Sequence, residues 1–409
     1  MSYNQAMAPT ALLTPIRNRT YLHLFSAQVV ALVGTGLLTV ALGLLAFDIA
    51  GGSAGRILAN ALTIKILIYV LLSPVVTALA ANWNPRPVLV GANLVRGAVA
   101  LTLPFIGAEW QLYLAIGLLQ AASATFTPTF QAVIPRILPE EEDYTRALSL
   151  SRLAYDLEQI ASPVLAAAML AVMSYTNLFL GTVVGFLASA VLVVITPLPR
   201  KPQTPTHRTG FVERTQRGIR IMLRERPLRA LLWLNLAVAA PMAMVMVNTV
   251  VIVRSELGMG ESALAWTLAI FGLGSMVVAA AVPGLLEKVT DRAVMLPGAV
   301  LGAVCLILLL IVPAPGYALI ALTWLLLGFA LSAMQTPIGR IVRANASEED
   351  LSYVFAAQFS LSHACYLITY PVAGWVGDSA GLWAATAALA ALAVLGTVMA
   401  ALTWPKESA

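Results

Sequence analysis

Twelve apolar runs, each at least 20 residues long, follow one another through the 409-residue sequence. A helix of about 20 mostly apolar residues crosses the hydrocarbon core of a bilayer. Only 11% of the residues are charged, against about 25% in typical soluble chains, so a water-soluble fold could not enclose this apolar surface. We therefore predict an all-α membrane protein with about twelve transmembrane helices, at 21–47, 57–81, 88–107, 111–134, 149–172, 177–197, 229–252, 262–286, 293–313, 317–338, 353–376 and 380–403.

Lysine and arginine are distributed unevenly between the two sides of this array. The longest polar stretch, 197–229, contains nine arginine or lysine residues. If the N-terminus is cytoplasmic, 20 of the 24 basic residues fall on the cytoplasmic side, as expected from the excess of lysine and arginine in cytoplasmic loops. We predict that both termini are cytoplasmic. The same distribution explains the net charge of +5 without invoking a nucleic-acid partner.

The two halves of the chain repeat each other. Three short matches occur in the same order, each offset by about half the chain: Thr127-Pro128 with Thr336-Pro337, Glu141–Asp143 with Glu348–Asp350, and Ser149–Arg152 with Ser360–His363. These matches align the fourth and fifth runs with the tenth and eleventh. The predicted unit is six helices, with halves at 1–198 and 229–409 joined by a basic linker at 199–228.

Two parallel six-helix halves joined by a basic loop resemble the major facilitator superfamily. Within it, the chain is similar to an exporter branch that holds enterobactin exporters, macrolide efflux proteins and putative nickel-resistance proteins. The residues that carry this likeness are Phe130–Pro135, Ala147–Ser149 and Asn93–Arg96, and the stretch Phe355–Pro371 is most similar to the nickel-resistance group. The resemblance implies a monomeric, multi-pass transporter of the bacterial inner (cytoplasmic) membrane.

The best-known loop motif of this family is degraded between the second and third runs. Arg86 is retained, but Asn82 stands where the motif has an acid. In the family that acid helps to latch the cytoplasmic side shut, so the resemblance implies a gating role for Asn82 and Arg86. Because Asn carries no charge, we expect the latch to be weaker or to be built elsewhere.

Ionisable side chains deep inside the apolar runs, well away from the ends of the helices, are candidate functional residues, because charges are costly in a bilayer. They are Lys65, Arg96, Asp156, Glu158 and His363. Asp156 lies four residues after Arg152, so the two are expected to pair on one helix face. Asp156 then either serves only to balance Arg152 or takes part in substrate or proton coupling.

Glu158 has no partner at helical spacing in its own run. It is expected either to face the cavity as a proton or cation site, or to pair with Lys65 or Arg96. A carboxylate poised between burial, which raises its pKa, and a nearby cation, which lowers it, could exchange protons with substrate. Lys65 is open to a coupling or a structural role, whereas Arg96 is expected to be structural, as is Arg152.

His363 occupies the position that Arg152 has in the first half of the repeat. Its alternatives are hydrogen-bonded packing and a role in coupling or metal binding together with Asp156 and Glu158. Imidazole suits nickel and its neighbours. Cys365 lies only two residues away on the helix, so it is expected to point elsewhere.

The sequence therefore predicts a secondary active transporter rather than an enzyme. No nucleotide-binding loop and no nucleophile–base arrangement is present, and no cofactor is expected. The leading expectation is a proton-coupled exporter of a divalent transition-metal cation such as nickel. The alternative is an exporter of amphiphilic drugs or a siderophore, and a non-transporting sensor is a third reading. The fold that the chain resembles implies cavity-lining roles for Gln120, Thr127, Gln131, Asn235, Asn248 and Gln335.

Overall fold

The first half of the protein is a bundle of long helices. The computed structural model describes residues 12–50, 54–79, 83–199, 211–312 and 315–405, which are almost entirely helical and contain no strand. In this bundle α2 packs against α7, and α4 packs against both α5 and α7. The helices are α2 (Arg19–Ala50), α3 (Ala54–Leu79), α4 (Pro85–Thr102), α5 (Glu109–Ile137), α6 (Glu141–Leu170) and α7 (Thr176–Ile195), with short 3-10 turns at η1 (Thr14–Arg17) and η4 (Leu103–Phe105).

The second half repeats this order after a short helix, α8 (Phe211–Arg224), in the linker. Three of its long helices are interrupted. Helix α9 (Arg226–Ala243) continues through the π-helical segments η5 (Met244–Asn248) and η6 (Val251–Glu256), α12 (Tyr317–Gln335) is followed by α13 (Ile338–Ala344), and α14 (Leu351–Pro371) by η7 (Val372–Val376) and α15 (Gly377–Ala380). The uninterrupted helices are α10 (Glu261–Leu286), α11 (Asp291–Ile311) and α16 (Leu382–Thr403).

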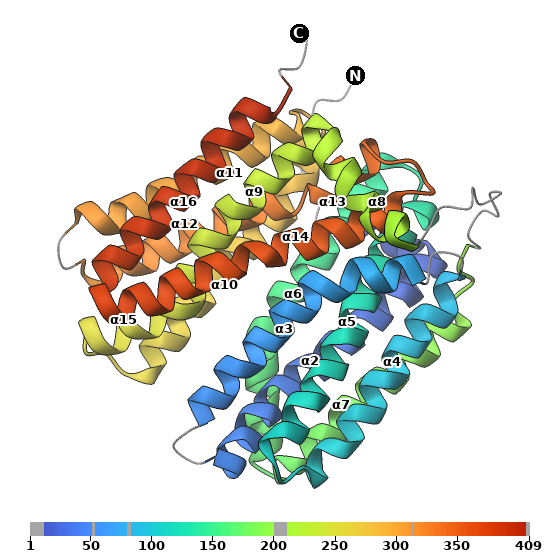
Figure 1. Cartoon of the computed structure of the whole chain (residues 1–409), viewed down its shortest axis with the longest axis horizontal. Coiled ribbons are helices and arrows are strands. Elements are labelled where there is room, and N and C mark those ends of the chain that lie inside the picture. Colours follow the sequence, from blue (N-terminus) through green and yellow to red (C-terminus); the bar gives the residue numbers. More distant parts are fainter. Residues whose placement is uncertain (1–11, 51–53, 80–82, 200–210, 313–314, 406–409) are drawn as a thin grey trace.

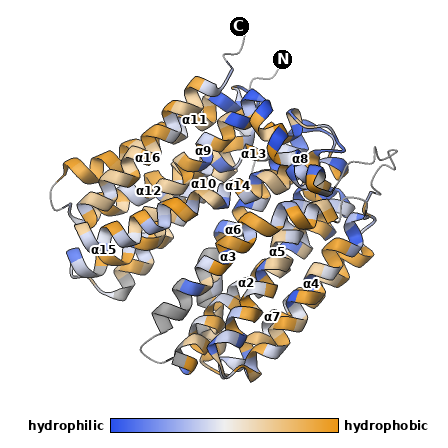
Figure 2. Cartoon of the chain, viewed as in Figure 1, coloured by the Kyte–Doolittle hydropathy of each residue, from blue (hydrophilic) through white to orange (hydrophobic). Residues whose placement is uncertain are grey.

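The outer surface of both halves is apolar. Nine helical stretches in the described residues are long and apolar enough to cross a membrane. Helices α5 and α6 fall outside this set because they carry polar residues along their length. Figure 2 shows hydrophobic colour along the helices, with hydrophilic colour gathered near α8. The all-α membrane architecture is confirmed, and the order of the helices follows the twelve apolar runs.

Both termini and α8 lie at one end of the molecule, which we call the termini end (Figure 1). The two halves converge there and diverge toward the other end, where α15 lies. Between the halves, α3 packs against α14, and α6 packs against α10. In the internal repeat α3 corresponds to α10 and α6 to α14. The contact between α3 and α14 is therefore equivalent to the contact between α10 and α6. The predicted limits at 198 and 229 stay a prediction, since residues 200–210 lie outside the described part.

Helix α8 spans the two halves at the termini end, since it contacts both α3 and α14. Arg217 pairs with Asp350 at 2.5 Å and lies over the ring of Tyr353. A Cβ on Gly218 would lie 2.0 Å from the carbonyl oxygen of Tyr353, so only glycine permits this close approach. The basic linker is therefore folded, in its described portion, against the closed end of the molecule.

Candidate functional site

An ionic network joins the halves midway along α6 and α10. The guanidinium of Arg152 lies 2.9 Å from Asp156 one turn away, as the spacing predicts. Arg152 also donates to Ser275 of α10 at 2.9 and 3.2 Å and to Gln335 of α12 at 2.5 Å. Ser275 in turn donates to Asp156 at 2.6 Å. We call these four residues the ionic seam. It places the charged pair between the halves, rather than within the first half alone.

The equivalent position between α3 and α14 is aromatic. The ring of Tyr69 lies 4.7 Å from Phe359 and 4.8 Å from His363, centroid to centroid. Phe359 and Tyr366 also contact the imidazole, at 4.4 and 6.0 Å. We call these four residues the aromatic seam. The repeat therefore sets Arg152 and His363 at matching contacts between the halves, one ionic and the other aromatic.

A cavity of about 420 Å³ lies between the two seams. Four of the six predicted lining residues border it, namely Thr127, Gln131, Asn235 and Gln335. Gln120 and Asn248 do not. Asn248 is buried in η5, with its side-chain oxygen near Gly377. The full lining is Tyr69, Thr127, Gln131, Leu148, Ser151, Arg152, Tyr155, Asn235, Val238, Gln335, Thr336, Ile338, Gly339, Phe355, Gln358, Phe359, Ser362, His363 and Tyr366.

Sequence reasoning missed several of these residues. Gln358 and Asn235 exchange two hydrogen bonds, at 2.8 and 3.2 Å, and so form a paired amide wall. Tyr69 and Tyr155 add phenol groups. Gln358 could have been predicted as a lining residue from its position in the repeated stretch, one helical turn before Ser362. Nothing in the local pattern around Tyr69 distinguished a lining tyrosine from a packing one.

Glu158 and Lys65 lie outside the cavity lining but interact with each other electrostatically. Ser162 donates to Glu158 at 3.4 Å, and the carboxylate lies over Gly36 of α2. The ammonium of Lys65 lies 5.7 Å from the ring centroid of Tyr69. Lys65 is therefore the link between Glu158 and the aromatic seam.

Arg96 is enclosed within the first half. Its guanidinium lies 4.6 Å from the rings of both Phe126 and Phe186 and donates to Asn93. Its Nε has no hydrogen-bond partner among the described residues. Contact with two rings accounts for a buried cation for which no ion pair is found among the described residues, because aromatic faces attract cations.

The predicted metal ligands are not gathered in this conformation. No group of three or more His, Cys, Asp or Glu side chains within the described ranges could hold a metal ion. Asp156 is 3% exposed and engaged by Arg152, whereas His363 lies in the aromatic seam on the opposite side of the cavity. Cys365 donates to the carbonyl of Leu361, in keeping with its expected orientation away from His363.

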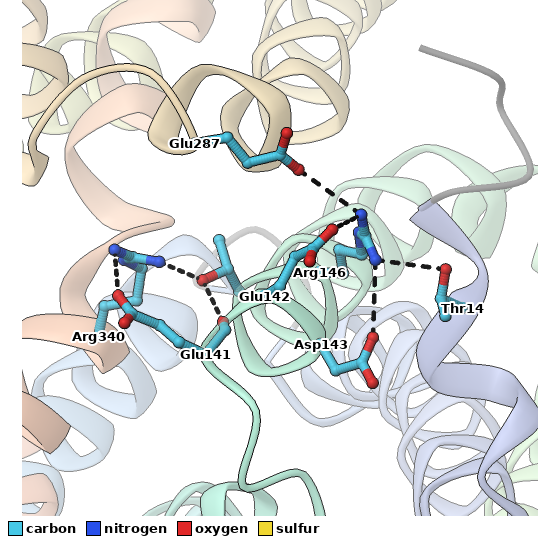
Figure 3. Close-up of polar contacts among 8 residues, drawn as sticks. Thr14, Glu141, Glu142, Asp143, Arg146, Glu287 and Arg340 are labelled. Carbon is cyan, nitrogen blue, oxygen red and sulfur yellow. Dashed lines mark hydrogen bonds and ion pairs between the residues drawn. The ribbon is translucent and has the colours of Figure 1, made fainter. Parts of the chain in front are cut away.

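Two arginines join the halves at the termini end (Figure 3). Arg340 of α13 lies 2.5 Å from Glu141 across the interface and 3.0 Å from Asp291 in its own half. Arg146 of α6 lies 3.6 Å from Glu287 across the interface and pairs closely with Glu142 in its own helix. We call these six residues the gate. Each arginine thus has an acid in both halves, and Arg146 also lies 3.7 Å from Asp143 of its own helix.

This double pairing lowers the free-energy cost of separating the two halves at the gate. When the halves separate, Arg340 keeps Asp291 and Arg146 keeps Glu142, so neither charge is left without a partner. Arg86, which was expected in the latch, instead donates to the carbonyl of Thr196 within the first half at 2.7 Å. Asn82 lies outside the described residues. The described contacts across this end therefore come from a different set of charges than the degraded loop motif.

Replacing Arg340 with Gln is expected to favour separation at the termini end. Half-exposed ion pairs are each worth about 0.5–1 kcal/mol, which shifts the open population about two- to five-fold. In a protein whose Cys305 and Cys365 have been replaced, spin labels would be attached at Glu140→Cys and Lys288→Cys, which are both exposed. Double electron–electron resonance would then measure the distance distribution between the two labels. Arg220→Gln on the exposed face of α8 is the matched control. An unchanged distance distribution in Arg340→Gln would contradict the assignment.

Curated relatives match about half of the chain. An uncharacterised MFS-type transporter, YfiS, of Bacillus subtilis (strain 168) is 22% identical over 218 residues, covering 52% of this chain and 51% of the relative. Macrolide efflux protein A of Streptococcus pyogenes is 22% identical over 215 residues, covering 51% and 52%. The chain thus spans about half the length of the curated relatives it matches.

Solved structures match nearly the whole fold. The human organic anion transporter MFSD10 (TETRAN) superposes with a TM-score of 0.80 at 13% identity, over 94% of this chain and 99% of that one. A bacterial homologue of the iron transporter ferroportin in its outward-facing state gives 0.78 at 13% identity, over 93% and 98%. The profile of the Major Facilitator Superfamily matches residues 24–260 and 236–409. The chain has the fold of a multi-pass membrane protein and belongs to the Major Facilitator Superfamily.

Proposed function

We propose that this transporter exports an amphiphilic organic molecule by alternating access. The observation that carries the proposal is the chemistry of the cavity. Aromatic rings from Tyr69, Phe355, Phe359 and Tyr366 face paired amides and hydroxyls, and no carboxylate borders it among the described residues. Apolar and aromatic walls with a few fixed polar groups are typical of sites for small organic molecules, and 420 Å³ lies within their usual range.

A divalent transition-metal substrate, the leading expectation from the sequence, has weaker support. Such an ion needs several imidazole, thiolate or carboxylate ligands at one point. Within the described residues the cavity offers one imidazole, and its only bordering charge is the cation of Arg152. The efflux of macrolides named for a relative agrees with the amphiphile alternative, and it also favours export as the direction.

The contacts at the two ends support the proposal of alternating access. The gate closes the termini end, while the helices diverge at the other end (Figure 1). If the termini are cytoplasmic, the conformation is one that releases substrate outside. Opening the cavity to the cytoplasm would require breaking the two cross-interface pairs of the gate, together with the hydrogen bonds from Arg136 to the Glu348 carbonyl and from Arg343 to the Pro139 carbonyl. Each gate arginine would keep an acid of its own half.

Glu158 is the proposed proton-coupling residue. Protonation of Glu158 removes the countercharge of Lys65, whose ammonium lies near the ring of Tyr69. Lys65 then interacts more strongly with that ring, because a cation without a counterion in a nonpolar site gains most from an aromatic face. Tyr69 contacts Phe359 and His363 of the other half. Protonation of Glu158 therefore changes the interactions at the aromatic seam.

Purified protein in proteoliposomes is expected to move an amphiphilic dye and not nickel. Rhodamine 123 and Ni²⁺ would be offered separately under an imposed pH gradient, with protein-free vesicles as the baseline. Dye flux that depends on the gradient supports the proposal. Nickel flux without dye flux would overturn it in favour of the metal alternative.

Glu158→Gln is expected to abolish the dependence of dye flux on the pH gradient, because Gln cannot take up a proton. The variant should still insert and elute as the wild type does in detergent. Glu140→Gln, in the exposed loop before α6, removes a carboxylate without touching Lys65 and should transport normally. Gradient-driven flux at the wild-type rate in Glu158→Gln would remove Glu158 from the coupling role.

A further inference from the structure

His363 stands at the edge of the cavity with one ring nitrogen already engaged. Its Nδ1 lies 2.7 Å from the carbonyl oxygen of Phe359, one turn earlier on α14. A carbonyl oxygen only accepts hydrogen bonds, so Nδ1 must carry the proton and donate it. In a neutral imidazole with a protonated Nδ1, the other nitrogen, Nε2, is an acceptor.

Three rings hold the imidazole in this orientation. Tyr69 meets it edge-on at an interplanar angle of 85°, and Phe359 and Tyr366 pack against it from α14. A ring fixed by neighbours and by one hydrogen bond presents its remaining nitrogen in a constant direction. Nε2 makes no hydrogen bond within the described part of the chain and is not a fully enclosed atom, and His363 borders the cavity.

Several other polar groups of the lining already have partners within the protein. Asn235 and Gln358 satisfy each other's amides, and Arg152 is held by Asp156, Ser275 and Gln335. Nε2 of His363 differs from these groups because its partner must come from the contents of the cavity. Desolvating such an acceptor with a molecule that has no donor to offer is unfavourable.

We propose that Nε2 of His363 accepts a hydrogen bond from the substrate, so that the transporter selects amphiphiles that carry an N–H or O–H donor beside an apolar or aromatic body. This inference rests on the proposed function and specifies its substrate class. The three aromatic rings around His363 contact the apolar body of the substrate, and the imidazole accepts a hydrogen bond from its N–H or O–H group. His363 is then a specificity-determining residue of the second half.

A matched pair of dyes tests the inference. Rhodamine 123 carries N–H donors, and tetramethylrhodamine methyl ester is the analogue with those nitrogens methylated. Binding of each dye to the purified full-length protein would be measured by fluorescence anisotropy. The ratio of the affinity for rhodamine 123 to that for the methylated dye is expected to be about 3- to 10-fold higher in the wild type than without the acceptor, the range of one hydrogen bond. His363→Phe, which keeps the ring and removes the acceptor, should lower the ratio by this factor.

Comparing the ratio of affinities between variants cancels the difference in lipophilicity between the dyes. His363→Gln restores an acceptor and should recover part of the preference, which a purely structural role for the imidazole would not give. Glu140→Gln serves as the control and should keep the full preference. Elution of each variant as a single species in detergent excludes misfolding as the cause.

The outcomes separate this inference from the proposed function. An affinity ratio of the two dyes that is the same in the wild type and in His363→Phe overturns the role of Nε2. Export of amphiphiles would stand in that case. Failure of the wild type to bind either dye overturns the inference together with the amphiphile proposal.

Discussion

The partly buried charge of Arg152 is the constraint on which the rest of the site depends. A guanidinium between membrane-spanning helices is tolerated only with a partner or with water. Asp156 supplies the countercharge from the same helix, and Ser275 and Gln335 supply hydrogen bonds from the other half. Because the charge needs both halves for its full set of bonds, the ionic seam fixes how α6 lies on α10. The cavity wall beside it is set by the same contact.

The repeat explains why the opposite wall is so different. Arg152 and His363 end the matched stretches Ser149–Arg152 and Ser360–His363, and both stand at a contact between the halves. One seam is held by an ion pair and a hydroxyl, and the other by tilted and edge-on ring contacts, with Lys65 over the ring of Tyr69. Two equivalent hinges with unlike chemistry allow one side to respond to a proton while the other stays paired. We infer that the aromatic seam, near Glu158 and Lys65, is the side that responds.

The fold could be predicted because its signals are local. Runs of 20 apolar residues, the basic linker and the internal repeat are all visible along the chain, and i, i+4 spacing predicted the Arg152–Asp156 pair. Thr127, Gln131, Asn235 and Gln335 were predicted as lining residues, because the fold that the chain resembles brings their helices to the centre.

What the sequence could not provide was the set of partners across the interface. Ser275 and Tyr69 meet residues more than 100 positions away, and no local pattern distinguishes them from packing residues. The gate was missed for the same reason, since Arg340 pairs with Glu141 from the other half. The proposed metal set of Asp156, Glu158 and His363 assumed that depth in the membrane implies proximity. Asp156 is bound by Arg152 in the ionic seam, Glu158 lies outside the cavity lining, and His363 belongs to the aromatic seam.

Separation of the halves at the termini end is the central claim, and a reversible cross-link tests it most directly. A Cβ on Gly339 of α13 would lie 2.7 Å from a methyl of Leu148 on α6, so cysteines at these positions can meet only while the end is closed. In a protein without Cys305 and Cys365, the disulfide between Leu148→Cys and Gly339→Cys should stop dye transport, and dithiothreitol should restore it. Full transport with the disulfide formed would contradict the account.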